Sequence, residues 1–285
     1  IRTLTSNEAV AFLARLLSLP DSYETTLHMV SMQFLGGRDG ENPRLEALFE
    51  KEAFKSIEKI HELIRNPHYT QVLYSLLANG KRDQLAKSVM EGIINHIVAN
   101  QNVSINYNVE EILSVLLEKY FDVTWPVLAN AMSSEEDESS QFYKLYWVLG
   151  GVLPYNKFSN IIFKKEHEQA LLDWCAKKPD INAYRLMSIA PMQSGDNFSD
   201  IVIQILNLYG DRNFVLTALE EKLGSFASTG SALPIYDSRI RLTESLVNHQ
   251  LPKVSAWAIL QIEKLKQARE QTRKFEEELT IPGRI

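Results

Sequence analysis

The side chains best suited to chemistry in this 285-residue chain are six histidines and one cysteine, and they do not cluster in sequence. Zinc sites are usually built from closely spaced His and Cys pairs, and no such pair occurs. Cys175 follows Trp174 within an apolar helical stripe, which is typical of a small buried hydrophobic residue. Glu110 and Glu111 are adjacent acids that face different sides of a helix. We therefore expect no catalytic residue, no metal ligand and no cofactor.

The glycine-containing segments lack the spacing of a phosphate-binding loop. The stretch 36–40 is rich in glycine, but no strand-like run precedes it, so it is predicted to be a connector. Gly80-Lys81 matches the end of a Walker loop. However, Ser75 and Arg82 stand where Gly and then Ser or Thr would be needed. A nucleotide site is therefore not predicted.

A basic group near the C-terminus is the one sequence feature suited to contact phosphates. Lys266, Arg269 and Arg273 lie at i, i+3 and i+7, and Arg239 and Arg241 precede them. Acidic residues interleave with this group, and the net charge of the chain is −6, whereas binding to phosphates requires a surplus of cations. We expect a solvated face with i, i+4 ion pairs. A helical nucleic-acid-binding module remains an alternative.

Apolar residues recur along the chain at the i, i+3, i+4 spacing of amphipathic helices, as in Ala9, Phe12, Leu13 and Leu16. Short Gly, Pro and Asn turns separate these segments, and short turns make successive helices antiparallel. The alternating stretch 103–107 is short and is predicted to be an extended connector. Each apolar stripe must be buried by stacking. The sequence therefore predicts an all-α fold, an α-solenoid of stacked antiparallel helix pairs resembling a HEAT/armadillo superhelix.

The clearest helix pair is predicted in a C-terminal unit at 233–278. A first apolar stripe contains Leu242 and Leu246, a polar turn at 248–250 interrupts it, and Pro252 opens a second stripe. A similar helix–turn–helix pattern at 201–223 precedes it by roughly 40 residues, within the range of HEAT-type repeats.

The chain 1–285 is predicted to be a single helical-repeat domain, with a sub-boundary considered near the acidic, serine-flanked segment 133–140. Because the chain begins with Ile1 instead of Met, we expect it to be a fragment of a longer protein. Effector activity would then belong to another part of that protein.

The C-terminal unit resembles known families. Its turn and second helix resemble those of a HEAT repeat, with Asn248 and Ser255 where that family usually has Asp and Arg. A wider pattern, from Tyr209 to about Glu278, resembles the C-terminal end of large bacterial multidomain proteins associated with anti-phage defence, several of which carry an ATPase or other effector domain. This resemblance implies a sensor or scaffold array attached to an effector. The pattern consists of Tyr209-Gly210-Asp211, Val215-Leu216, Ala218-Leu219, 228–231, Pro234, Tyr236 and Arg239.

Exposed aromatic and basic side chains are the candidate partner-binding residues. Tyr143 and Trp147 lie off the apolar stripe of their helix, either exposed or partly covered by a neighbouring helix, and exposed aromatics are enriched at interfaces. The same role is predicted for Tyr236, Arg239 and Arg241. The predicted function is a non-enzymatic scaffold or sensor that binds a protein partner or an effector domain of its own chain. A helical enzyme with a site not visible in the sequence is a second alternative.

Cysteine usage and hydropathy bear on location. A single cysteine allows no intrachain disulfide, and no apolar run approaches the ~20 residues of a membrane span. We predict a cytoplasmic protein with no membrane partner.

Overall fold

The computed structural model is all-α, as predicted. Within the residues it describes it contains fifteen α-helices, and its only sheet is a hairpin of two-residue strands. The described residues are 7–35, 43–55, 57, 66–99, 107–134, 138–149, 157–226 and 230–279.

Packing divides the chain into two compact units, Ile1–Val148 and Leu149–Ile285, which are described separately. This division lies after the segment 133–140, of which residues 135–137 fall outside the described part. The predicted connectors at 36–40 and 103–107 also lie outside it, except for Tyr107, which is the first residue of α7 and not part of an extended connector. A single cooperative domain over 1–285 stays a prediction.

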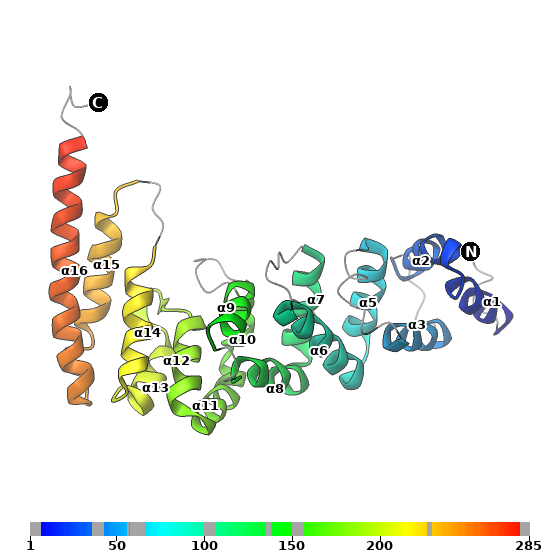
Figure 1. Cartoon of the computed structure of the whole chain (residues 1–285), viewed down its shortest axis with the longest axis horizontal. Helices are drawn as coiled ribbons and strands as arrows, with labels where there is room; N and C mark the ends of the chain where they lie inside the picture. The colour runs from blue at the N-terminus through cyan, green and yellow to red at the C-terminus, as the bar shows by residue number, and fades with distance from the viewer. Residues whose placement is uncertain are drawn as a thin grey trace. The chain divides into compact units, whose positions relative to one another are not determined.

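In the first unit, two successions of helices pack together (Figure 1). Helices α2, α5 and α7 contact one another in turn, and so do α1, α3, α6 and α8, while α9 packs on α6 and α8. The bounds are α1 Asn7–Leu17, α2 Pro20–Leu35, α3 Pro43–Lys55, α5 Pro67–Asn79, α6 Asp83–Ala99, α7 Tyr107–Lys119, α8 Phe121–Met132 and α9 Glu138–Val148.

Local sequence explains where α5 begins. The Asn66 side chain accepts hydrogen bonds from the backbone N–H groups of His68, at 2.9 Å, and Tyr69, at 3.3 Å. Pro67 occupies the first helical position, where a missing N–H has no cost. The apolar stripe that follows is fully buried, with Leu77 0% exposed. Capping and periodicity therefore agree for this helix.

The second unit contains the remaining helices and the hairpin. Strands β1 Gln193–Ser194 and β2 Asn197–Phe198 pair antiparallel, and Gly195 at the turn has φ 61°. The hairpin was not predicted, because two-residue strands show no alternation. The helices are α10 Lys157–Ile162, α11 Glu168–Lys177, α12 Pro179–Ile189, α13 Asp200–Tyr209, α14 Asn213–Gly224, α15 Leu233–Glu244 and α16 Pro252–Leu279.

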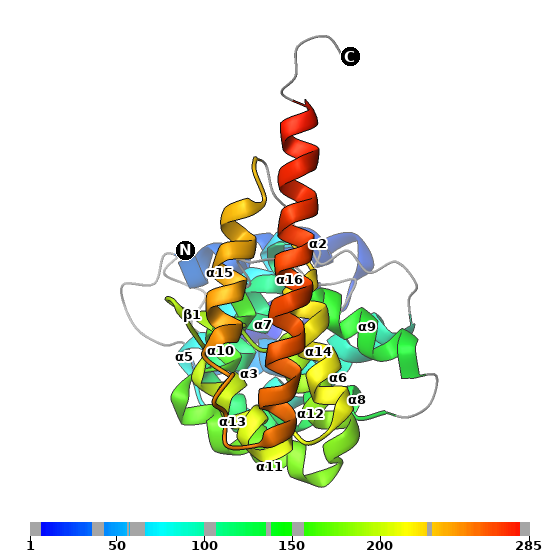
Figure 2. The same cartoon turned by 90° about the vertical axis from the view of Figure 1, so that its left-hand side faces the viewer.

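The C-terminal helix pair is confirmed as α15 and α16. Figures 1 and 2 show α16 beside α15 and running beyond it. Ile240, Ile262 and Leu265 form the core between them. Where α13 approaches the start of α16, a Cβ at Gly210 would lie 2.5 Å from Val254 Cγ2. A residue with no side chain is therefore needed at this crossing.

Side chains from later helices bond the C-terminal carbonyl groups of earlier ones in both units. Lys144 Nζ donates to the Val98 carbonyl near the end of α6 at 2.6 Å, and Lys222 Nζ donates to the Ser188 carbonyl near the end of α12 at 2.8 Å. The last carbonyls of a helix have no intrahelical donor, and the negative end of the helix dipole favours a cation there. These lysines therefore join helices instead of forming a basic surface.

Candidate functional site

A groove of about 740 Å³ lies in the first unit, on the outer side of α6 and α8. Its walls come from two helices that contact each other along their length, and one residue of α9 closes it. Its apolar lining residues are Ile94, Val98, Val123, Pro126, Val127 and Ala131. Its polar lining residues are Lys87, Glu91, Asn95, Asp122, Asn130 and Gln141.

Helical periodicity places these side chains on the groove. In α6, Ile93 and Ile97 are buried in the core, whereas Glu91 and Asn95, four residues apart, are exposed along the opposite face. In α8, likewise, Trp125 and Leu128 are buried, whereas Asp122, Pro126 and Asn130 are exposed on the groove side. Sequence reasoning missed the site, because its two walls lie about 30 residues apart and only their packing forms a concave surface.

The groove has an excess of acceptors over donors at the start of α8. Pro126 has no N–H group and therefore cannot donate to the backbone carbonyl of Asp122, four residues earlier. That carbonyl and the exposed Asp122 carboxylate both belong to the first turn of α8, and both Asp122 and Pro126 line the groove. The Asp122 carbonyl thus lacks its usual i+4 donor, and the exposed Asp122 carboxylate lies in the same turn.

The lysines of α6 to α9 do not offset this excess. These helices carry three lysines against seven Asp and Glu. Lys119 and Lys144 donate to the carbonyls of Ala78 and Val98. The third, Lys87, has its ammonium 3.9 Å from Glu91 in an exposed i, i+4 pair, a type worth only about 0.3–0.5 kcal/mol.

The predicted aromatic residues of α9 are exposed. Tyr143 is 49% and Trp147 65% exposed, so neighbouring helices do not cover them. Tyr146 lies between them, with ring centroids 6.3 Å from Tyr143 and 6.2 Å from Trp147. They form an aromatic patch on a different flank of α9 from Gln141, the α9 residue of the groove.

The other predicted partner-binding residues lie on α15 in the second unit, where Arg239 and Tyr236 pack against the end of α14 and the Phe226 ring. Arg239 is 6% exposed, donates to the carbonyls of Leu223 and Ser225 at the end of α14, and stacks with its guanidinium 4.5 Å from the Phe226 ring centroid. Tyr236 packs edge-on against the same ring at 5.3 Å. Burial lowers the pKa of Arg239. Arg239 is therefore buried and bonded to the end of α14, and its partner-binding role stays a prediction.

The predicted basic stripe of α16 is largely neutralised. Arg269 Nε lies 2.6 Å from an Asp237 oxygen of α15, and this hydrogen bond holds the pKa of Asp237 below its usual value. Arg273 pairs with Glu270 at 2.6 Å and also contacts Glu277. Arg241, on α15, is exposed, and Tyr236 is half-buried.

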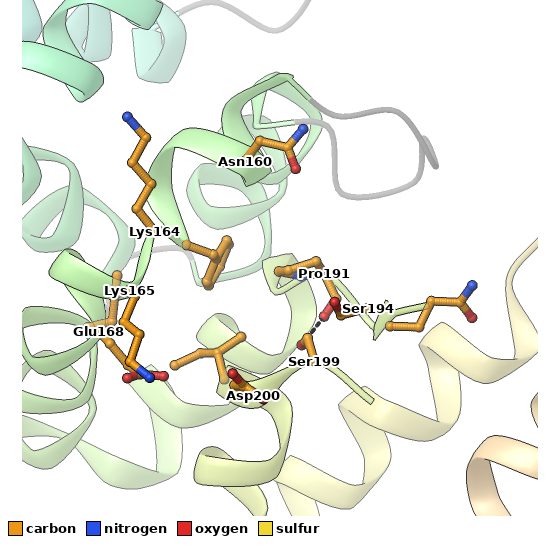
Figure 3. A pocket seen from close by; sticks show the side chains of 12 residues that line it. Asn160, Lys164, Lys165, Glu168, Pro191, Ser194, Ser199 and Asp200 are labelled. Atoms are coloured by element: carbon orange, nitrogen blue, oxygen red, sulfur yellow. Dashed lines mark hydrogen bonds between the residues drawn. The ribbon is translucent and has the colours of Figure 1, made fainter. Parts of the chain in front are cut away.

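A second, smaller cavity of about 260 Å³ lies in the second unit (Figure 3). Lys164 extends away from it, and the Ser199 hydroxyl donates to the Pro191 carbonyl instead of to a basic group. Glu168 accepts a hydrogen bond from Gln204 at 2.5 Å. The lining therefore shows no nucleophile paired with a base, the arrangement that covalent catalysis requires.

Two further reactive groups, the buried Cys175 and the half-buried Lys222, lie outside both cavities. Burial raises the pKa of Cys175 to about 12, so the thiol stays protonated, as expected for a buried hydrophobic residue. Burial lowers the pKa of Lys222 to about 8. No local pattern singles out Lys222, because the position of its ammonium depends on the end of α12.

Comparison with protein-family models, curated proteins and solved structures finds no match. Among the described residues, no three His, Cys, Asp or Glu side chains gather as a metal site requires, and none of the described helices is long and apolar enough to cross a membrane.

Proposed function

We propose that this chain is a non-enzymatic protein-binding scaffold or sensor module, built as an α-solenoid, and that the groove of α6 and α8 is its binding surface. The groove is the observation that carries the proposal. Stacked helix pairs offer extended concave surfaces for binding without polar catalytic residues. The exposed aromatic patch of α9 is a second contact surface of the same unit.

The solenoid architecture is supported by a regular spacing of polar contacts. Many hydrogen bonds and ion pairs between helices join residues 32 to 46 positions apart, close to the repeat of about 40 residues in the sequence. In a stack of repeats, each unit contacts its neighbour at equivalent positions. Examples are Tyr120 with Leu77, Lys144 with Val98, Gln250 with Asn207 and Lys264 with Glu220.

The polar bonds at the C-terminal turn fit a HEAT-like stack despite its atypical residues. Gln250 Nε2 lies 3.2 Å from the Asn207 amide oxygen, 43 residues earlier, and Lys253 donates to the Asp211 carbonyl. These bonds join the turn at 248–250 to the last part of α13, and the start of α16 to the turn that follows α13. With the resemblance to bacterial defence proteins, this supports a cytoplasmic recognition arm of a larger protein that carries its own effector.

A nucleic-acid-binding function is less well supported. The basic group predicted for it includes Arg239, which is buried, and Arg269 and Arg273, which are ion-paired. Phosphate contact would require these pairs to open, and the first unit has a strong excess of acids.

Site-specific photo-crosslinking tests the proposed binding surface. A photoreactive amino acid replaces Asn95 or Asn130 in the groove, or Lys51, an exposed residue of α3, as the matched control. In cells that produce the full protein, we expect one discrete protein adduct from both groove positions and none from Lys51. The added substitution Val127→Arg should remove that adduct while leaving the circular dichroism melt unchanged. An adduct that also forms from Lys51, or that persists with Val127→Arg, would contradict the proposal.

A further inference from the structure

We propose that the occupant of the α6/α8 groove is a cationic amphipathic protein segment, one that presents Lys or Arg beside apolar side chains. This inference rests on the proposed function, because it names the chemical class of the partner at the same groove. It depends on three properties of the first unit: the apolar floor, the acceptors near Asp122 and the charge of the unit.

The apolar floor requires apolar side chains in the partner. Ile94, Val98, Val123 and Val127 line the groove from both helices, and the three valines are only half-buried, so they keep apolar surface that a partner can cover. The volume of about 740 Å³ lies within the ~300–1,000 Å³ typical of binding pockets. Burial of apolar area supplies most of the affinity at such a surface. Several side chains of one segment fit there.

The acceptors near Asp122 require donors in the partner. A guanidinium or ammonium group carries several N–H donors and no acceptor. It can therefore satisfy the Asp122 carboxylate and the backbone carbonyl that Pro126 leaves without a donor. Glu91 lies on the facing wall, and its weak exposed pair with Lys87 can exchange for a partner cation. An acidic segment would instead bring its carboxylates close to the Asp122 carboxylate, which would repel them.

The net negative charge of the whole first unit also favours a cationic partner. Residues 1–148 contain 13 Lys and Arg against 20 Asp and Glu, a net charge of −7, whereas residues 149–285 contain 17 against 16. A field of one sign steers an oppositely charged partner and raises its association rate. Lys119 and Lys144 donate to helix carbonyls, and Lys87 is the one cation among the lining residues against the carboxylates of Glu91 and Asp122.

Three synthetic peptides test the inference on the full chain. They share one amphipathic pattern of Leu and Val and differ only in their polar residues, which are Lys, Gln or Glu. Fluorescence anisotropy at low and high salt measures their binding. We expect the Lys peptide to bind, the Gln peptide to bind at least about tenfold more weakly, and the Glu peptide not to bind. The affinity of the Lys peptide should fall as salt rises.

Two charge reversals locate the interaction. Asp122→Lys should weaken the Lys peptide at least about tenfold, which corresponds to about 1.4 kcal/mol, and Asp122→Asn should have an intermediate effect. Glu110→Lys makes the same charge change on α7, outside the groove, and should weaken binding less than about threefold. Thermal melts confirm that each variant is folded.

The possible results separate the two proposals. Equal binding of the Lys and Glu peptides, no binding of any peptide, or equal effects of Asp122→Lys and Glu110→Lys would overturn the cationic occupant. A discrete adduct in the photo-crosslinking experiment would still support the protein-binding groove. Loss of that adduct as well would overturn the groove itself.

Discussion

The buried guanidinium of Arg239 offers a sharp test of how the C-terminal helices are held together. In the variant Arg239→Met, a flexible apolar side chain of similar length replaces a charge that is 6% exposed and has no carboxylate partner among its hydrogen bonds. Its bonds join α15 to the end of α14 through the Leu223 and Ser225 carbonyls. The substitution therefore removes a connection between two helices without creating a large cavity.

The expected loss of unfolding free energy in Arg239→Met is the sum of what the two carbonyl groups and the Phe226 ring lose. Leu223 is 0% exposed, so its carbonyl is left without a donor, which costs about 1–3 kcal/mol. Ser225 is exposed and its carbonyl can bond water instead. Loss of the contact with the Phe226 ring costs about 1 kcal/mol. Relief from burying the charge offsets part of this sum. We expect a net destabilisation of about 2 kcal/mol.

Urea denaturation followed by hydrogen exchange of α14 and α15 peptides measures this loss within the second unit. The conservative variant Arg239→Lys keeps the charge but not the planar fork and should cost about 1 kcal/mol. The control Arg241→Met, exposed on the same helix, should stay within about 0.5 kcal/mol of the parent chain. If Arg239→Met were as stable as the parent, the buried hydrogen bonds would contribute nothing net and the reasoning would be refuted.

Three further changes have defined outcomes. Gly210→Ala should destabilise the second unit by about 1–3 kcal/mol, because its methyl group would press against Val254; a thermal melt unchanged from the parent would show that the crossing can relax. Lys222 has its pKa lowered to about 8 by burial, so between pH 8 and 10 the unfolded chain binds more protons at this residue and stability gains with rising pH. The difference in unfolding free energy between the parent and Lys222→Met should therefore grow in favour of the parent over that range, and a constant difference would argue against the burial of Lys222. Cys175, with its pKa raised to about 12, should react with a thiol reagent at pH 8 only as fast as the second unit unfolds, and rapid labelling of the native chain would disprove its burial.

The helices themselves were predictable because their signals are local. Asn66 and Pro67 fix the start of α5 within four residues, and Pro252 opens α16 as expected. The apolar stripes identify the buried faces, and Tyr143 and Trp147 were placed off their stripe correctly. Whether these two rings would be exposed was left open, because that depends on which helix packs beside α9.

The candidate site was not predictable, because it depends on contacts between distant residues. Glu91 and Asp122 belong to different helices, and only the packing of α6 on α8 brings their faces to one groove. Arg239 shows the opposite case. In sequence it lies two residues from the exposed Arg241 and suggests a basic surface, yet it is buried against the end of α14.

Hydrophobic periodicity and capping act within a few residues. The all-α fold class, the extent of most helices and the lack of a recognisable catalytic motif can therefore be read from the sequence alone. Which basic side chains bond to the end of another helix depends on tertiary packing. Lys119, Lys144, Lys222 and Arg239 are drawn onto the carbonyl ends of neighbouring helices. A cation at a helix C-terminus replaces the donors that the helix lacks, and no local pattern reveals which helix end lies nearby.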